Sequence, residues 1–211
     1  MRQRLSALKF VFLSLRLISS CSIDKQNSNR TIEDIADEIL DATILRYPST
    51  PSLYSIKNSP HDQLYDNSLN ALKQWQIRED QWLEELDTIG EPKKVGSRDW
   101  VTFGIIYESL AASRHARVCR KELWETSTTT AWYTGLPFIF DIQPLDSANL
   151  KSQALNRLGQ VSHFIDREIQ NLTIGLSQGY SSPRITVEAV PSEVRMLLES
   201  NSPFRLMGAR A

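Results

Sequence analysis

The chain has 211 residues, of which 41% are hydrophobic, so it can bury a core and is not a disordered tail. Its formal net charge of −1 gives no electrostatic reason to expect nucleic-acid binding. The two cysteines, Cys21 and Cys119, do not make a disulfide framework.

The first twenty residues are typical of a secretory signal. They hold four basic residues and no acidic one, with an apolar run at 10–15 and small residues before Cys21. The run is too short to remain as a membrane-spanning helix. Ile18-Ser19-Ser20-Cys21 resembles the bacterial lipobox, in which the cysteine becomes the lipid-modified first residue. Arg16, a charge beside the apolar run, departs from that pattern.

We therefore predict a signal peptide over residues 1–20, lipidation at Cys21 and a polar tether over 21–30. The lipid anchor makes the membrane a partner. Ser22 behind the cysteine favours the outer membrane, with the protein facing the periplasm. The alternative is a cytoplasmic protein whose signal is not processed.

Capped apolar stripes predict the first helices. Thr31 with Asp34 approximates a capping box, and the stripe of apolar residues that follows in the sequence ends before Pro48. Residues 66–68 offer caps for a second helix, which closes at Gly90. A third is predicted from about 98 to 124. Its buried side should carry Trp100, Phe103, Gly104, Tyr107, Leu110, Ala111 and Val118.

Residues 126–146 show no helical period and predict an irregular connection that buries aromatic side chains. One long helix is then expected from Ser147 to the left-handed cap Gly179, on a stripe that includes Val161, Ile165, Ile169, Leu172 and Leu176. A last helix should begin at Pro183 with Ser182 as cap, and Pro191 should kink or restart it. Candidate groove residues are Trp132, Tyr133, Tyr180 and Arg184.

The predicted fold is an all-α bundle of about five or six helices. No catalytic or metal-binding residue is predicted. Gly175 to Gly179 match G-x-S-x-G, but at the end of a helix rather than on a strand-to-helix turn, so Ser177 is not expected to be a nucleophile. His115 and Cys119 are one helical turn apart, but the surrounding basic residues oppose a cation. Patterns typical of nucleotide binding are missing.

Six segments, in this order and spacing, carry a family resemblance: Tyr47–Thr50, His61–Ser68, Trp75–Trp82, Asp99–Thr102, Arg117–Trp124 and Ile165–Arg184. From about residue 32 to Phe204, the chain resembles the bacterial family called domain of unknown function 885, whose members are described as zinc metallopeptidases. Members are usually longer and largely helical, and carry an H-E-x-x-x-G-H type zinc motif beyond the region matched here. This chain lacks that motif.

The resemblance implies that residues 31–204 are the amino-terminal part of a larger helical metallopeptidase-like fold, inactive alone and related to enzymes that cleave peptides. Zinc is expected only in complete members. Residues 205–211 do not resemble the family, from which we hypothesise a frameshift or early stop near residue 204. Such a truncated bundle should leave Trp132, Phe138, Phe140 and parts of the last helix exposed.

Two alternatives remain at this point. One is a stand-alone helical lipoprotein that binds a peptide or protein partner through the aromatic segment 132–140. The other is a degraded gene product without a selected role. Neither composition nor motif spacing identifies a substrate or an oligomeric state.

Overall fold

A computed structural model describes residues 30–56, 59–127, 131–199 and 201–210. The predicted signal and Cys21 lie outside the described residues. Contacts divide the chain into Met1–Arg30 and Thr31–Ala211, and all elements described below belong to the second unit. Every regular element among the described residues is a helix, which confirms the predicted all-α class.

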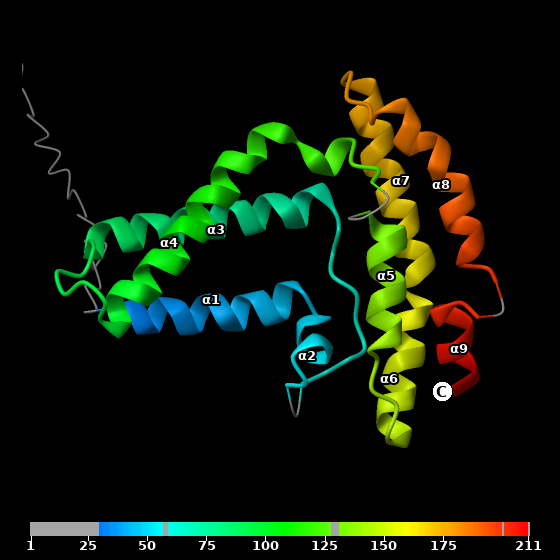
Figure 1. Ribbon diagram of the computed structural model, residues 1–211, viewed down its shortest axis with the longest axis horizontal. Helices are drawn as coiled ribbons and strands as arrows, with labels where there is room; N and C mark the ends of the chain where they lie inside the picture. The colour runs from blue at the N-terminus through cyan, green and yellow to red at the C-terminus, as the bar shows by residue number, and fades with distance from the viewer. Residues whose placement is uncertain (1–29, 57–58, 128–130, 200, 211) are drawn as a thin grey trace, which may run out of the picture. The chain divides into compact units, whose positions relative to one another are not determined.

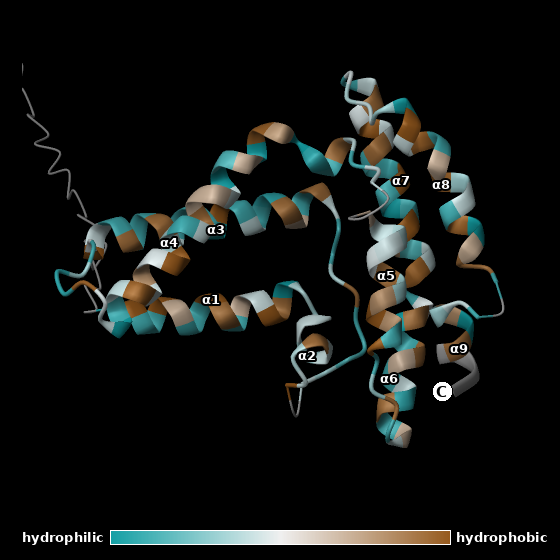
Figure 2. Ribbon diagram, viewed as in Figure 1, coloured by the Kyte–Doolittle hydropathy of each residue, from teal (hydrophilic) through white to brown (hydrophobic). Residues whose placement is uncertain are grey.

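Three helices, α1 (Ile32–Arg46), α3 (Leu69–Ile89) and α4 (Arg98–Ala116), pack against one another (Figure 1). Both brown and teal residues occur along each of them, as expected of amphipathic helices (Figure 2). Their shared core consists of Ile32, Ile35, Trp82, Leu83, Leu86, Phe103 and Leu110. The predicted caps are present, because Thr31 and Asp34 form a capping box and Ser68 caps α3. A single helical turn, α2 (Thr50–Leu53), follows α1.

The third helix ends earlier than expected. After α4, the chain makes two 3₁₀ turns, η1 (Arg117–Cys119) and η2 (Lys121–Leu123), on either side of Arg120. Arg120 is left-handed, with φ 46°, which a continuous α-helix does not allow. The prediction of a helix to residue 124 with Val118 buried is therefore wrong, and Val118 is 83% exposed.

The segment predicted to be irregular contains helix α5 (Trp132–Asp141). Tyr133, Leu136 and Phe140 are spaced along one face, and all three are buried. Tertiary burial of that face outweighs the helix-breaking tendencies of Gly135 and Pro137. Phe140 packs on Phe204 of α9 (Pro203–Arg210) at 5.1 Å between ring centroids, so the prediction that Phe140 is exposed is wrong. Phe138 is 52% exposed, as predicted, whereas Trp132 is half-buried.

The long helix expected from Ser147 is two helices, α6 (Ala148–Gly159) and α7 (Val161–Ser177), which meet at Gln160. The Gln160 side chain bonds the backbone of Asp62 and Leu64, so this junction is fixed by a distant segment. The buried face also differs from the predicted stripe. Phe164, Asn171 and Gly175 are buried, whereas Ile169 and Leu176 are exposed.

The last long helix, α8 (Arg184–Met196), continues through Pro191 instead of restarting there. Ser182 does not cap it, because its hydroxyl bonds the backbone of Trp124 and Thr126. The left-handed cap at Gly179 is confirmed, with φ 85°. Among the described residues, no helix is both long and apolar enough to cross a membrane.

Candidate functional site

Residues 59–68 form an extended segment without helix or strand, and side chains of α6 and α7 hold it in place. Gln153 accepts a hydrogen bond from the backbone N–H of His61 at 2.7 Å, and the amide nitrogen of Asn67 donates to the carbonyl of Phe164 at 3.0 Å. Asn171 in turn donates to the carbonyl of Asn67 at 2.8 Å. These contacts place the extended segment beside α6 and α7.

Arg157 of α6 is fully buried and forms hydrogen bonds that also hold the extended segment. Its guanidinium donates to the carbonyl oxygens of Pro48 and Gln63, both at 2.9 Å, and to Oε1 of Gln143 at 2.6 Å. Burial lowers the pKa of Arg157 to about 10. No carboxylate within the described part of the chain pairs with it, so its role is to organise backbone carbonyls.

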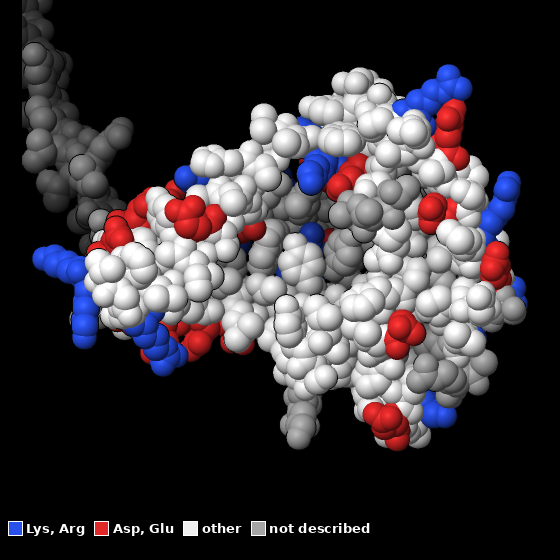
Figure 3. Space-filling view, viewed as in Figure 1, with Lys and Arg blue, Asp and Glu red and all other residues white. Residues whose placement is uncertain are grey.

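Where these segments meet, the surface contains a cavity of about 250 Å³, here called the central hollow. Figure 3 shows that the visible face is hollowed near its middle and that basic and acidic side chains both lie around the depression. The lining residues come from α1, the extended segment, α3, η2, α5 and α7 or the residues directly beside them, and include aromatic and charged groups: Arg46, Tyr47, Tyr65, Asn67, Leu72, Lys121, Glu122, Glu125, Ala131, Trp132, Glu168, Asn171 and Leu172.

Arg46, the last residue of α1, supplies the cation on one side of the hollow. Its guanidinium carbon lies 5.5 Å from the ring centroid of Tyr47 and 5.8 Å from that of Tyr65. One terminal nitrogen donates to the backbone carbonyl of Asp66, and the buried Nε has no hydrogen-bond partner among the described residues. The aromatic rings therefore hold the guanidinium while leaving part of its donor capacity unused.

Glu168 of α7 supplies a carboxylate to the same hollow. Its Oε1 accepts a hydrogen bond from the side-chain amide of Asn67 at 2.8 Å. Burial raises the pKa of Glu168, and the Asn67 hydrogen bond opposes this rise only in part. Burial, together with the nearby charge of Glu168, also raises the pKa of Tyr65 to about 12, so its hydroxyl stays protonated as a donor at neutral pH.

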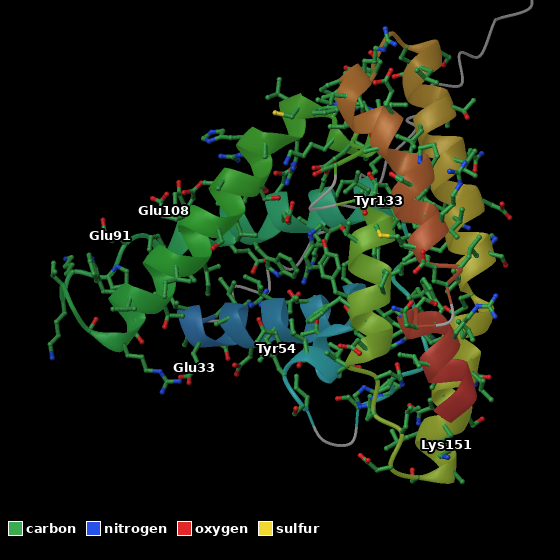
Figure 4. The ribbon with its side chains drawn as sticks, turned by 45° about the vertical axis from the view of Figure 1, so that its right-hand side comes forward. Glu33, Tyr54, Glu91, Glu108, Tyr133 and Lys151 are labelled. Atoms are coloured by element: carbon green, nitrogen blue, oxygen red, sulfur yellow. The ribbon has the colours of Figure 1, made fainter. Side chains whose placement is uncertain are left out.

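The four candidate groove residues are not brought together. Trp132 lines the central hollow, but Tyr133 of α5 (Figure 4) is only 3% exposed and its hydroxyl has no hydrogen-bond partner. Tyr180 lines a separate apolar hollow of about 200 Å³ with Leu176 and Val187. Arg184 is exposed and pairs with Glu188 at 2.6 Å.

The residues of the G-x-S-x-G match have structural contacts. The hydroxyl of Ser177 donates to the carbonyl of Ile174 in its own helix at 2.7 Å. At Gly175, an added Cβ would lie 1.8 Å from the carbonyl oxygen of Leu123, so α7 approaches η2 too closely for a side chain. These contacts account for Gly175 and Ser177 through packing and helix termination.

The described residues do not fit a zinc ion. Nδ1 of His61 is hydrogen-bonded to the hydroxyl of Ser52 at 2.8 Å, and Nε2 of His163 lies 2.7 Å from a guanidinium nitrogen of Arg167. His115 is exposed at the end of α4. No group of three or more histidine, cysteine or acidic side chains in the described ranges has an arrangement that could hold a metal ion. We assign no chemical step to zinc in this chain.

Sequence reasoning missed several residues of this region: Arg46, Tyr65, Asn67, Arg157, Glu168 and Asn171. A signal was available for two of them. Arg157 follows the buried Ala154 by three positions, and Asn171 is seven positions after the buried Phe164 on the same helical face. A polar residue on a buried face requires a partner, and the extended segment supplies one to each, the carbonyl of Gln63 to Arg157 and that of Asn67 to Asn171.

Comparison with known proteins identifies a family. The model of a family described as "Bacterial protein of unknown function (DUF885)" matches residues 48–208, most of the chain. The match continues past Phe204, where the resemblance was expected to stop. No curated protein matches the chain.

Proposed function

Since the chain belongs to this bacterial family of unknown function, we propose that it binds peptides as the helical amino-terminal portion of a secreted, lipid-anchored hydrolase of the peptidase type. It supplies binding rather than bond cleavage. The peptidase class rests on the resemblance carried by the six sequence segments, since the matching family is itself described as of unknown function. The binding role rests on the central hollow.

The observation that carries the binding role is the combination of groups around the central hollow. Trp132 and Tyr65 provide apolar surface, while Arg46 and Glu168 provide a hydrogen-bond donor and an acceptor of opposite charge. A peptide carries donors and acceptors at every residue, together with side chains that pack on aromatic surface. The lining combines aromatic and apolar surface with several charged and amide side chains, which suits a ligand that is itself partly polar.

The direct test is the binding of an unlabelled peptide pool to the purified full chain, measured by equilibrium dialysis. We expect saturable binding that weakens at least tenfold in Trp132→Ala. The matched control is Trp100→Ala, since Trp100 is also half-buried but lies in α4, away from the hollow. Circular dichroism checks that both variants keep their helices. Undetectable binding, or equal binding by Trp132→Ala and the wild type, would overturn the proposal.

A second candidate function is docking of a protein partner. The observation in its favour is the apolar hollow between η2, α7 and α8, where Leu176 is 65% and Val187 48% exposed. Under this alternative, the chain is a stand-alone helical lipoprotein. Binding that is retained in Trp132→Ala and lost in Leu176→Ser would favour it over the peptide site.

A further inference from the structure

Two of the charged groups around the central hollow have no opposite charge as partner among the residues that the structure describes. Arg46 has no ion pair with a described carboxylate, and Glu168 is bonded to the neutral amide of Asn67. The other charged groups of the hollow are compensated. Glu122 pairs with Arg120 at 2.7 Å, and Lys121 lies 3.9 Å from Glu125.

Tyr65 is close to both of these charges. The guanidinium of Arg46 is over its ring, and the charge of Glu168 acts on its hydroxyl. Within the described residues, Arg46 and Glu168 form no ion pair with each other. The hollow therefore presents a positive and a negative group that are both next to the same aromatic side chain.

Keeping a partly buried charge without a counter-charge costs folding free energy. A ligand that brings the missing charges offsets this cost on binding, because charge-assisted hydrogen bonds are the stronger ones. The unpartnered Nε of Arg46 shows that the protein alone leaves this guanidinium incompletely bonded. A ligand with one charge would compensate only one of the two groups.

The volume limits the size of the ligand. The hollow measures about 250 Å³, below the roughly 300–1,000 Å³ typical of pockets for drug-sized molecules. A dipeptide matches this scale and carries an ammonium at one end and a carboxylate at the other. An extended protein segment carries neither charge in its interior backbone.

We infer that the central hollow binds short unblocked peptides, with the dipeptide as the best-fitting class. The free ammonium is held by Glu168 and the free carboxylate by Arg46. Trp132 and Leu172 contact the side chains. This inference rests on the proposed peptide-binding function and adds the recognition of both peptide ends.

Isothermal titration of the full chain with Ala-Phe, N-acetyl-Ala-Phe and Ala-Phe-amide tests the inference. We expect each blocked form to bind the wild type at least tenfold more weakly than the free dipeptide. In Glu168→Gln, acetylation should no longer weaken binding. In Arg46→Gln, amidation should no longer weaken it. Each combination forms a double-mutant cycle between one peptide end and one side chain.

Glu188→Gln is the matched control, because Glu188 is an exposed carboxylate of α8. It should keep the full preference for unblocked ends. If the wild type binds the free and the blocked dipeptides equally well, the inference that the hollow recognises both peptide ends is overturned. The proposed peptide-binding function still stands in that case, provided that binding depends on Trp132. If no peptide binds at all, both fail. The wild-type comparison needs no variant, so a variant that fails to fold does not prevent the test.

Discussion

The guanidinium of Arg157 connects α6 to residues far away in sequence. Three backbone or amide oxygens depend on it for a donor, namely those of Pro48, Gln63 and Gln143. Removing a buried charged donor leaves its acceptors unpaired, which costs more than the net value of the hydrogen bonds.

We therefore expect Arg157→Met to lower the free energy of unfolding by roughly 3–5 kcal/mol. Arg157→Lys should lose less, because it keeps the charge but cannot reproduce the planar fork. Urea denaturation followed by circular dichroism measures both. The control Arg184→Met removes an exposed arginine and should change stability little. A stability of Arg157→Met close to that of the wild type would contradict the assigned role.

Glu168 gives a pH-dependent prediction. Burial raises its folded-state pKa above the ordinary value of 4.5, so the folded state binds more protons than the unfolded state between these two pKa values. The contribution of this group to stability is therefore favourable at low pH, and it is lost as pH rises through the folded pKa. Above the folded-state pKa, the buried and ionised carboxylate lowers the stability of the fold.

We expect Glu168→Gln to be more stable than the wild type by about 1 kcal/mol at pH 7, while binding peptides less well. The advantage should shrink as pH falls toward 4.5 and disappear below it. Thermal unfolding of both proteins across this pH range measures the difference. If Glu168→Gln is less stable than the wild type at pH 7, the negative charge of Glu168 is compensated in the folded protein and the prediction is wrong.

At the scale of elements, the position of α7 depends on how closely it approaches η2. Gly175→Ala would place a Cβ against the carbonyl oxygen of Leu123, a backbone atom that cannot rotate away. We expect a loss of roughly 1–3 kcal/mol or more, measured by chemical denaturation. Gly104→Ala in α4 is the control, since nothing lies within 4 Å of an added Cβ there. That change should be neutral or stabilising, and equal effects of the two substitutions would refute the packing argument.

Local signals predicted the elements whose ends are set by their own residues. Thr31, Ser68 and Gly179 cap helices as expected, because a cap is a contact between residues a few positions apart. The division between α6 and α7 and the helix over 132–141 depend on packing against distant segments. Hydrophobic periodicity within one segment contains no information on those contacts.

The central hollow was harder to predict for the same reason. Of the four candidate residues, only Trp132 lines it. Arg46, Tyr65 and Glu168 meet because the extended segment is bonded to α7 across about one hundred residues. Nothing in the sequence marks Arg46 or Glu168 as a binding residue, because single charged residues on helices are usually exposed to solvent.

At the scale of the whole molecule, the proposed lipid anchor connects the helical unit to a membrane. We expect the full-length protein, expressed in a Gram-negative host, to fractionate with the outer membrane and to incorporate labelled fatty acid. Cys21→Ser should abolish both, because the modified thiol is the only attachment proposed. Cys119→Ser is the control and should change neither. Soluble, unlabelled wild-type protein would contradict the predicted anchor.

The central claim is that peptides bind in the hollow between α1, α5 and α7. Heteronuclear NMR of the ¹⁵N-labelled full chain, titrated with Ala-Phe, tests it most directly. The account predicts saturable shifts of the Trp132 indole N–H and of the side-chain amides of Asn67 and Asn171. Shifts confined to residues around Leu176 and Val187, or no shifts at saturating peptide, would contradict it.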